Sequence, residues 1–256
     1  MSLRTLVGRL RHHDWTAVAI ELLIVVVGVF IGLQVSNWNE ERKETARGDE
    51  YLRRLGVELR GDSRELEQIS AFWTKVDDYG AAAIAHAEDG TLLHGSAWQT
   101  LLAYYQASQV WPYRKSDVTF QEIRSNGDLL LIRDPGLRER ISRHYSAAAG
   151  SQVVEVLGLI PRYREDVRGM TPWKIQQYIW SNCYESERAN QALKDCESPV
   201  SESEALAVLE RYRQSSTLTD ELRFWMVNVG NGLMLMSGIR AEVDRLADEV
   251  EHALAH

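Results

Sequence analysis

Proline and cysteine are scarce in this sequence, and glycine does not gather in tracts. The 256 residues include five prolines, two cysteines and seventeen glycines, and no stretch is rich in Gly and Ser or in Pro. Such tracts are typical of disordered segments and linkers, and the repeats of roughly 20–50 residues that are typical of solenoids are also lacking. With 45% hydrophobic residues, the chain is long enough for one sizeable core plus an appendage.

Acidic residues outnumber basic residues beyond the first part of the sequence. The formal net charge is −8; residues 1–16 carry +2 and Glu21 contributes −1, so the remaining residues carry −9. The charged residues of the first region are Arg4, Arg9, Arg11 and Asp14. Nucleic-acid binding normally requires clustered Lys and Arg side chains that displace counterions. The acidic remainder therefore predicts no nucleic-acid partner.

Recognisable catalytic or metal-binding constellations are lacking as well. The seven histidines are scattered, at His12, His13, His86, His94, His144, His252 and His256. No C-x-x-C pair occurs, and no nucleophile, base and orienting group stand together in a known pattern. The pair His144-Tyr145, in an arginine-rich segment, is predicted to lie on a solvated helix face. The sequence predicts no enzyme, no cofactor and no metal site.

One long apolar run is present near the N-terminus. It covers residues 16–35, TAVAIELLIVVVGVFIGLQV, in which Glu21 and Gln34 are the strongly polar members. About twenty helical residues at 1.5 Å each cross a hydrocarbon core of roughly 30 Å. Trp15 and Trp38 bracket the run, at the positions where indole rings prefer the membrane interface. The run predicts a transmembrane helix.

A cleaved signal peptide is the main alternative, but its apolar region is shorter, roughly 7–15 residues, and it ends at a small-residue site that this run lacks. Three arginines precede the run and a region of mixed charge follows it, so the positive-inside rule favours a cytoplasmic N-terminus. We therefore predict a single-pass protein of the cell inner membrane. Its parts are a basic cytoplasmic tail at 1–15, a transmembrane helix at 16–36 and an exterior (periplasmic) helical domain at 37–256.

One face of the predicted membrane helix carries small and polar residues. Glu21, Gly28, Gly32 and Asn39, called the seam below, fall within about 20° of one line along a helix. Gly28-x-x-x-Gly32 is the spacing that allows close approach of two membrane helices. We predict that the seam packs against a second copy, giving a homo-oligomer, or against another membrane helix. A lone anchor, with Glu21 protonated or reaching the interface, is the alternative.

Beyond the run, apolar residues recur at helical spacing among many Arg and Glu, so the membrane helix is predicted to continue to about Ala87. Capping and proline signals predict further helices. One helix is predicted over 97–108, one from near Ser116, and one from Pro135, which follows the N-cap Asp134. The others are predicted after Thr171-Pro172, after the capping box Ser201-x-x-Glu204 that precedes Leu206 and Leu209, and over 220–253 after the cap Thr219. The predicted fold class is all-α, with one N-terminal transmembrane helix continuing into an irregular helical bundle.

Two apolar features are assigned to the core of that bundle. Residues 224–239 are too few for a second span and are interrupted by Asn228 and Asn231, so they are predicted to form a core helix. Trp173 and Trp180 have helical spacing, which favours core packing over the lining of a pocket.

The two cysteines, Cys183 and Cys196, flank a polar segment. In an oxidising compartment they are able to close a small loop, which stabilises the fold by roughly 3 kcal/mol in the loop-entropy treatment. Two reduced core residues are the alternative. We favour a disulfide because the predicted topology places this domain outside the cytoplasm.

Three residue strings resemble a known family. They are Glu21-Leu-Leu-Ile-Val-Val-Val-Gly28, then Gly32-Leu-Gln34-Val-Ser-Asn37-Trp38-Asn39-Glu40, and Thr119-Phe-Gln-Glu-Ile-Arg-Ser125-Asn-Gly127 with Asp134-Pro-Gly-Leu137-Arg and Tyr145 downstream. They are similar to the bacterial domain-of-unknown-function family 6090, whose members are short single-pass membrane proteins. Members commonly have Ala where this chain has Gly32. The resemblance, over most of the chain, implies location and architecture but no chemistry, and it adds nothing to the disulfide prediction.

Three classes of function are weighed. The leading hypothesis is a membrane-anchored helical interaction or scaffold module. The alternative is an extracytoplasmic small-ligand sensor domain that acts through a separate membrane partner, because a tail of about fifteen residues is too short for an output domain. An enzyme is least favoured. A deep pocket with converging charges favours the sensor or the enzyme, whereas a closed core with an apolar surface stripe favours the interaction module.

Overall fold

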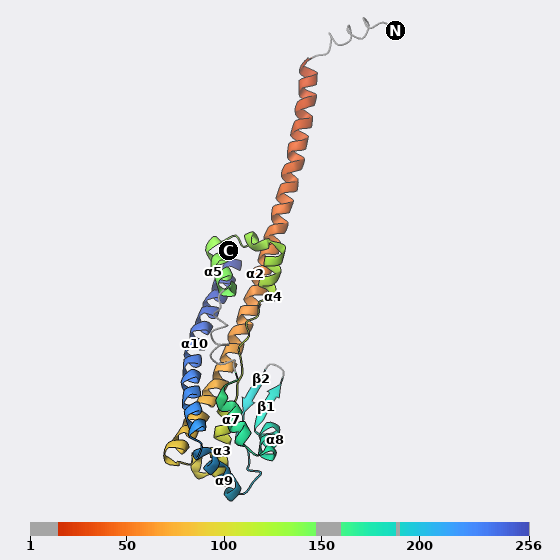
Figure 1. The fold of residues 1–256 in the computed structure, drawn as a ribbon. Helices are drawn as coiled ribbons and strands as arrows, with labels where there is room; N and C mark the ends of the chain where they lie inside the picture. The colour runs from red at the N-terminus through yellow and green to blue at the C-terminus, as the bar shows by residue number, and fades with distance from the viewer. Residues whose placement is uncertain (1–14, 147–159, 188–189, 256) are drawn as a thin grey trace, which may run out of the picture.

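The structure is a computed structural model, and it describes residues 15–146, 160–187 and 190–255, with the side chains of 15–18 and 187 also outside the described part. The predicted basic tail at 1–15 therefore lies almost wholly outside the described residues. Within them the fold is all-α, as predicted: a long rod enters a helical bundle with one small hairpin (Figure 1). The helices are α2 (Trp15–Asp89), η1 (Leu93–Gly95), α3 (Ala97–Gln106), α4 (Val118–Asn126), η2 (Asp128–Leu131), α5 (Pro135–Ser146), α7 (Arg162–Met170), α8 (Trp173–Asn182), α9 (Glu202–Arg213) and α10 (Ser216–Leu254).

The predicted rod is confirmed: α2 is one 75-residue helix that joins the apolar run to the bundle. It is the one described helix that is long and apolar enough to cross a membrane, and its most apolar window has a mean hydropathy of 2.3 with none of it buried. The first buried residue of α2 is Gly48, and Gly90, at φ 82°, follows the helix end. The same helix is thus fully exposed over its first part and forms the core over its second.

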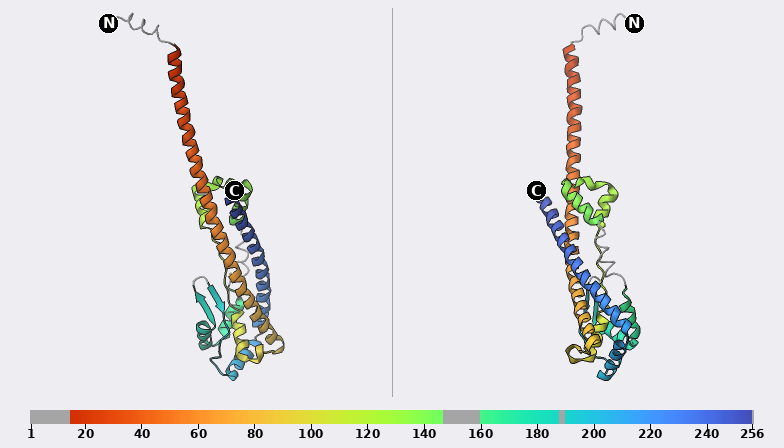
Figure 2. Two further views of the ribbon diagram at one scale, coloured as in Figure 1. Left: turned by 180° about the vertical axis from the view of Figure 1, so that it is seen from behind. Right: turned by 60° about the vertical axis from the view of Figure 1, so that its left-hand side comes forward.

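The bundle is built on the antiparallel pair of α2 and α10, which lie side by side in all three views (Figures 1 and 2). A β-carbon on Gly80 of α2 would lie 2.1 Å from the Met226 sulfur on α10, and one on Gly56 would lie 3.5 Å from Val250. Glycine therefore permits the closest approach of the two helices at Gly80. The helix predicted over 220–253 is confirmed as α10, and it turns a row of buried residues, among them Trp225, Val229 and Met236, toward the core.

Aromatic residues fill the centre between α2, α3 and α10. Trp73 is fully buried and packs edge-on against Trp225, with 5.8 Å between the ring centroids. Each indole N–H donates to a backbone carbonyl: Trp73 to Trp111 at 2.9 Å, and Trp225 to Ala107 at 2.8 Å. These bonds satisfy the polar atoms of both rings, which would otherwise be costly to bury.

The short elements cover the two ends of this pair. α3 and α9 lie at the end far from the N-terminus, and α4, η2 and α5 lie where α2 enters the bundle (Figure 1). The capping box of Ser201 with Glu204 is confirmed, and so is the left-handed Gly127 after α4, at φ 72°. β1 (Tyr184–Glu187) and β2 (Asn190–Leu193) form an antiparallel hairpin in which Tyr184 pairs with Leu193. The polar segment between the cysteines did not predict this hairpin.

Several local predictions are wrong. α10 is capped by Ser215, whose hydroxyl accepts from the backbone N–H of Leu218, while Thr219 lies inside the helix and bonds back to the Ser215 carbonyl. Two apolar residues within the predicted helices, Val57 on α2 and Leu206 on α9, are exposed, because each falls off the face that its helix turns inward.

Candidate functional site

The seam residues of α2 are all exposed and lie on the part of the rod that precedes the bundle. Nothing described lies within 4 Å of a β-carbon built on Gly28 or Gly32. This face is therefore open to another helix within the described residues, and packing of the seam stays a prediction. Near the end of the apolar segment, the Arg42 guanidinium lies 5.1 Å from the centroid of the Trp38 ring, an arrangement that suits a membrane interface.

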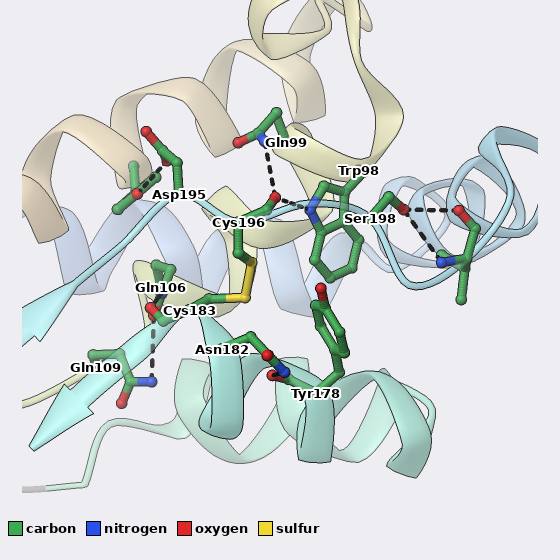
Figure 3. The surroundings of a disulfide bond; sticks show 12 residues. Trp98, Gln99, Gln106, Gln109, Tyr178, Asn182, Cys183, Asp195, Cys196 and Ser198 are labelled. Atoms are coloured by element: carbon green, nitrogen blue, oxygen red, sulfur yellow. Dashed lines mark hydrogen bonds between the residues drawn. A yellow bond between two sulfur atoms is a disulfide. The ribbon is translucent and has the colours of Figure 1, made fainter.

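Cys183 and Cys196 are joined by a disulfide, with 5.2 Å between their Cα atoms (Figure 3). Both backbone carbonyls accept hydrogen bonds from α3. The Cys183 carbonyl accepts from the Gln106 amide at 2.7 Å, and the Cys196 carbonyl accepts from the Trp98 indole at 2.8 Å. The disulfide thus closes the loop that contains the hairpin, and the hydrogen bonds from Gln106 and Trp98 hold its two ends against α3, which indicates a structural role.

A cleft of about 1000 Å³ lies between α2, α5 and the C-terminal part of α10. Its charged lining residues are Asp49, Arg133, Asp134, Arg140, Asp248 and Glu249. Most of these charges are already engaged: Arg140 pairs with Glu249 at 2.5 Å, and Asp248 pairs with Arg60 at 2.5 Å. The Asp134 carboxylate accepts from the backbone N–H groups of Leu137 and Gly136, which lowers its pKa. These three carboxylates and Arg140 are thus already engaged by an ion pair within the cleft, by Arg60 outside it and by backbone N–H groups.

The third of the strings that resemble family 6090 has a structural role beside this cleft. Asp128, which follows Gly127, accepts a hydrogen bond from the Tyr51 hydroxyl at 2.8 Å and pairs with Arg47. At the other end of α4, the Thr119 hydroxyl donates to the Glu58 carboxylate at 2.6 Å. These bonds dock α4 and η2 onto α2 where the rod enters the bundle.

A buried ionisable cluster lies between α2 and α5. Burial raises the pKa of Asp62 to about 6, although Ser116 N–H and Tyr113 O–H donate to its carboxylate. Burial, and then the nearby positive charge of Lys115, lower the pKa of His144 to about 4. Lys115 itself donates to the His144 carbonyl, and burial lowers its pKa. The cluster holds ionisable groups of both signs close together in the interior.

The solvated position predicted for His144 is wrong. His144 is buried because Leu137, Ile141 and His144 recur at i, i+4 and i+7 on the inward face of α5. Among the described residues, its Nε2 atom and the Tyr145 hydroxyl have no hydrogen-bond partner. In the sequence, the arginines around His144 make this helical spacing of apolar residues hard to recognise.

The core packing predicted for Trp173 and Trp180 is also wrong. α8 turns Ile175 and Ile179 inward, so Trp173 is 69% exposed and Trp180 lies at the edge of the buried face. The Arg168 guanidinium lies 5.3 Å from the Trp180 ring centroid, and the Tyr184 ring packs edge-on against the Trp180 ring, with 4.7 Å between the two centroids. Neither tryptophan lines a described cavity.

The prediction that residues 224–239 belong to the core holds for one face of α10 only. On the opposite face, Phe224 is 68% exposed, Val227 65% and Met234 66%. Six exposed uncharged residues recur there at steps of three and four: Phe224, Val227, Asn231, Met234, Gly238 and Ala241. We call this row the α10 stripe. Sequence periodicity identified the inward face, but the outward face was missed because apolar residues on both faces were assigned to one core.

Five of the six residues of the α10 stripe, all but Ala241, lie in a stretch without charges. The two arginines that flank this stretch form ion pairs with α2: Arg223 pairs with Glu88 at 3.0 Å, and Arg240 pairs with Glu67 at 3.1 Å. Between these two arginines, α10 carries no charged side chain. An exposed apolar row on a chain of which 26% is charged is the kind of surface that marks a protein interaction site.

The described residues contain no group of three or more His, Cys, Asp or Glu side chains that is able to hold a metal ion. No protein-family model, no curated protein and no solved structure matches the chain. The resemblance to family 6090 therefore rests on the three residue strings and stays a prediction.

Proposed function

We propose that the chain is a membrane-anchored helical interaction or scaffold module. The observation that carries this proposal is the α10 stripe, an uncharged row on the outside of a domain whose inward faces are packed. The alternative class requires a pocket with converging charges. In the cleft of the described residues, Arg140 is instead paired with Glu249, and Asp248 is paired with Arg60 outside the cleft.

The proposed location is the cell inner membrane, with residues 16–36 as the span, the N-terminus in the cytoplasm and residues 37–256 in the periplasm. Three observations support it. The first part of α2 is apolar and none of its most apolar window is buried, which is costly in water. Arginines precede it. The Cys183–Cys196 disulfide is of a kind that persists in oxidising compartments.

Labelling tests this topology. Val57 is 69% exposed on α2 and lies beyond the span, so Val57→Cys places one free thiol outside the membrane in the proposed orientation. In spheroplasts of cells that express the full chain, a membrane-impermeant maleimide is expected to label Val57→Cys and not the wild type. Labelling only after the inner membrane is permeabilised would contradict the orientation.

The interaction role is tested by crosslinking in membranes at native expression level, followed by affinity purification and mass spectrometry. One stoichiometric partner, or a self-crosslinked species, is the expected result. For the seam, Gly28→Leu and Gly32→Leu are expected to change the oligomeric state in membranes, whereas Phe30→Leu, on the opposite face of the helix, leaves it unchanged. A chain that stays monomeric and recovers no partner would overturn the proposed function.

The cleft supports a second candidate, the extracytoplasmic sensor for a small polar ligand. Its volume of about 1000 Å³ is sufficient for a small molecule, and Arg140 lines it. A ligand of this class would raise the unfolding temperature of the wild type in detergent but not that of Arg140→Ala. A screen of small acids and amines without any such difference would count against the sensor.

A further inference from the structure

The α10 stripe has the spacing of a coiled-coil seam. Its six residues alternate in steps of three and four, so they occupy successive a and d positions of a heptad repeat. Two glycines on this surface lower the stability of the helix in the monomer. Gly230 and Gly238 lie inside the helix, where glycine costs roughly 0.5–1 kcal/mol relative to Ala. Nothing described lies within 4 Å of a β-carbon built on either one, so no contact in the monomer requires glycine there.

The membrane is not able to cover the α10 stripe. Met226 contacts Gly80 of α2, which is 42 residues beyond Trp38 at the end of the apolar segment. At 1.5 Å per residue, this part of α10 lies about 60 Å along the rod from that point. In Figure 1 the same part of α10 lies toward the end of the bundle that is far from the N-terminus. Lipid is therefore excluded as the occupant unless the rod lies flat on the membrane.

A second copy fits the α10 stripe on geometric grounds. Two chains anchored in one membrane by the same segment are parallel, and their stripes lie at the same height. In a parallel pair each a residue faces its own counterpart, so Asn231 meets Asn231 of the other chain. A single Asn at an a position fixes register in parallel dimers, because the two amides hydrogen-bond to each other. Among the described residues the Asn231 amide has no partner, so it is available for this bond.

The distribution of charge also supports a second copy as the partner that covers the α10 stripe. The residues after Glu21 carry −9, so most surfaces of two copies repel each other. Five of the six residues of the α10 stripe lie in the sixteen uncharged residues between Arg223 and Arg240, and Ala241 follows Arg240. Over these five positions two copies meet without opposing like charges. A stripe of about 26 Å is short for a coiled coil between free proteins. Anchoring in one membrane raises the effective concentration, so a smaller contact is sufficient.

We propose that the α10 stripe is a homodimer interface, in which α10 pairs in parallel and in register with α10 of a second copy. This inference rests on the proposed interaction function and names its partner. It differs from packing of the seam, because it places the contact in the exterior domain and away from the membrane.

Cysteine crosslinking of the full chain in native membranes tests the proposal with two matched variants. Val227→Cys places a thiol at a d position of the α10 stripe, and Val57→Cys places one on α2; the two valines have similar exposure, 65% and 69%. The native cysteines are bonded to each other and do not compete. After mild oxidation with copper phenanthroline, Val227→Cys is expected to give about tenfold more reducible dimer than Val57→Cys.

A second substitution checks that the contact is the α10 stripe. Met234→Glu adds a charge at an exposed position, so it is expected to leave the unfolding temperature unchanged and to remove the Val227→Cys dimer by like-charge repulsion. Equal crosslinking at Val57 and Val227, or none at Val227, would overturn the homodimer. A Val227→Cys adduct with a different protein would also overturn it but would leave the proposed interaction function standing.

Discussion

The sulfur of Met226 on α10 occupies the space that a side chain on Gly80 of α2 would need. A β-carbon on Gly80 would lie 2.1 Å from that sulfur and 2.9 Å from the Met226 Cγ atom. Met226 is itself largely buried, so it has little room to move aside. This contact sets how closely the two long helices of the bundle approach each other.

Gly80→Ala is therefore expected to destabilise the domain by about 1–2 kcal/mol, because overpacking outweighs the gain in helix propensity. Gly61→Ala is the matched control on the same helix, since nothing described lies within 4 Å of its β-carbon, and it is expected to stabilise by about 0.5–1 kcal/mol. Thermal unfolding of the full chain in a mild detergent, followed by circular dichroism, measures both. Equal unfolding temperatures for the two variants would show that Met226 rearranges without cost.

The disulfide is expected to contribute measurably to stability. The two cysteines are 13 residues apart in sequence. Removal of a loop constraint of this size costs about 3 kcal/mol, which lowers the unfolding temperature by roughly 10 °C. The double variant Cys183→Ser, Cys196→Ser is expected to show this decrease, and a reductant is expected to lower the wild type to the same temperature without affecting the variant. Free thiols in the unfolded, unreduced wild type would contradict the bond.

The buried cluster predicts two pH effects of opposite sign. The pKa of Asp62 is about 6 in the fold against 3.8 ordinarily, so between these values the folded state binds more protons and stability falls as pH rises. The pKa of His144 is about 4 against 6.5, so over that interval the unfolded state binds more protons and stability rises with pH. In the wild type the two effects oppose each other between about pH 4 and 6.

Substitution of either residue is expected to reveal the effect of the other. His144→Gln leaves the Asp62 effect, so stability falls by on the order of 2 kcal/mol from pH 4 to 6. Asp62→Asn leaves the His144 effect, so stability rises over the same interval. Chemical unfolding at pH 4, 5 and 6 measures both slopes. Parallel profiles for the two variants would mean that these groups do not titrate as assigned.

The helices were predictable from a continuous apolar face, as on α10, or from a recognisable cap, as at Ser201 of α9. The cap of α10 was not predicted correctly, because Ser215 and Thr219 are both residues that form caps. The hairpin was not predictable, since its short polar strands depend on contacts made by residues distant in sequence, such as the hydrogen bond from Tyr79 to Asp195 at 2.7 Å. The spacing of Leu137, Ile141 and His144 indicates one buried helix face, but the arginines around His144 led to the prediction of a solvated face.

The α10 stripe shows a different limit of sequence analysis. Periodicity identifies the inward face of a helix, but it does not show whether apolar residues on the opposite face are covered. Trp225 and Val227 are two residues apart, yet Trp225 is buried and Val227 is 65% exposed. Only the structure shows that the apolar side chain of Val227 is left on the surface of the described residues.

The unbroken course of α2 has a mechanical consequence. Because no proline or loop separates the apolar segment from the bundle, a turn of that segment about its own axis is transmitted as torque to the whole helical bundle. Each residue inserted after Trp38 would rotate the domain by about 100° and raise it by about 1.5 Å. The direction in which the α10 stripe faces about the axis of the rod is therefore set by the number of residues in the rod.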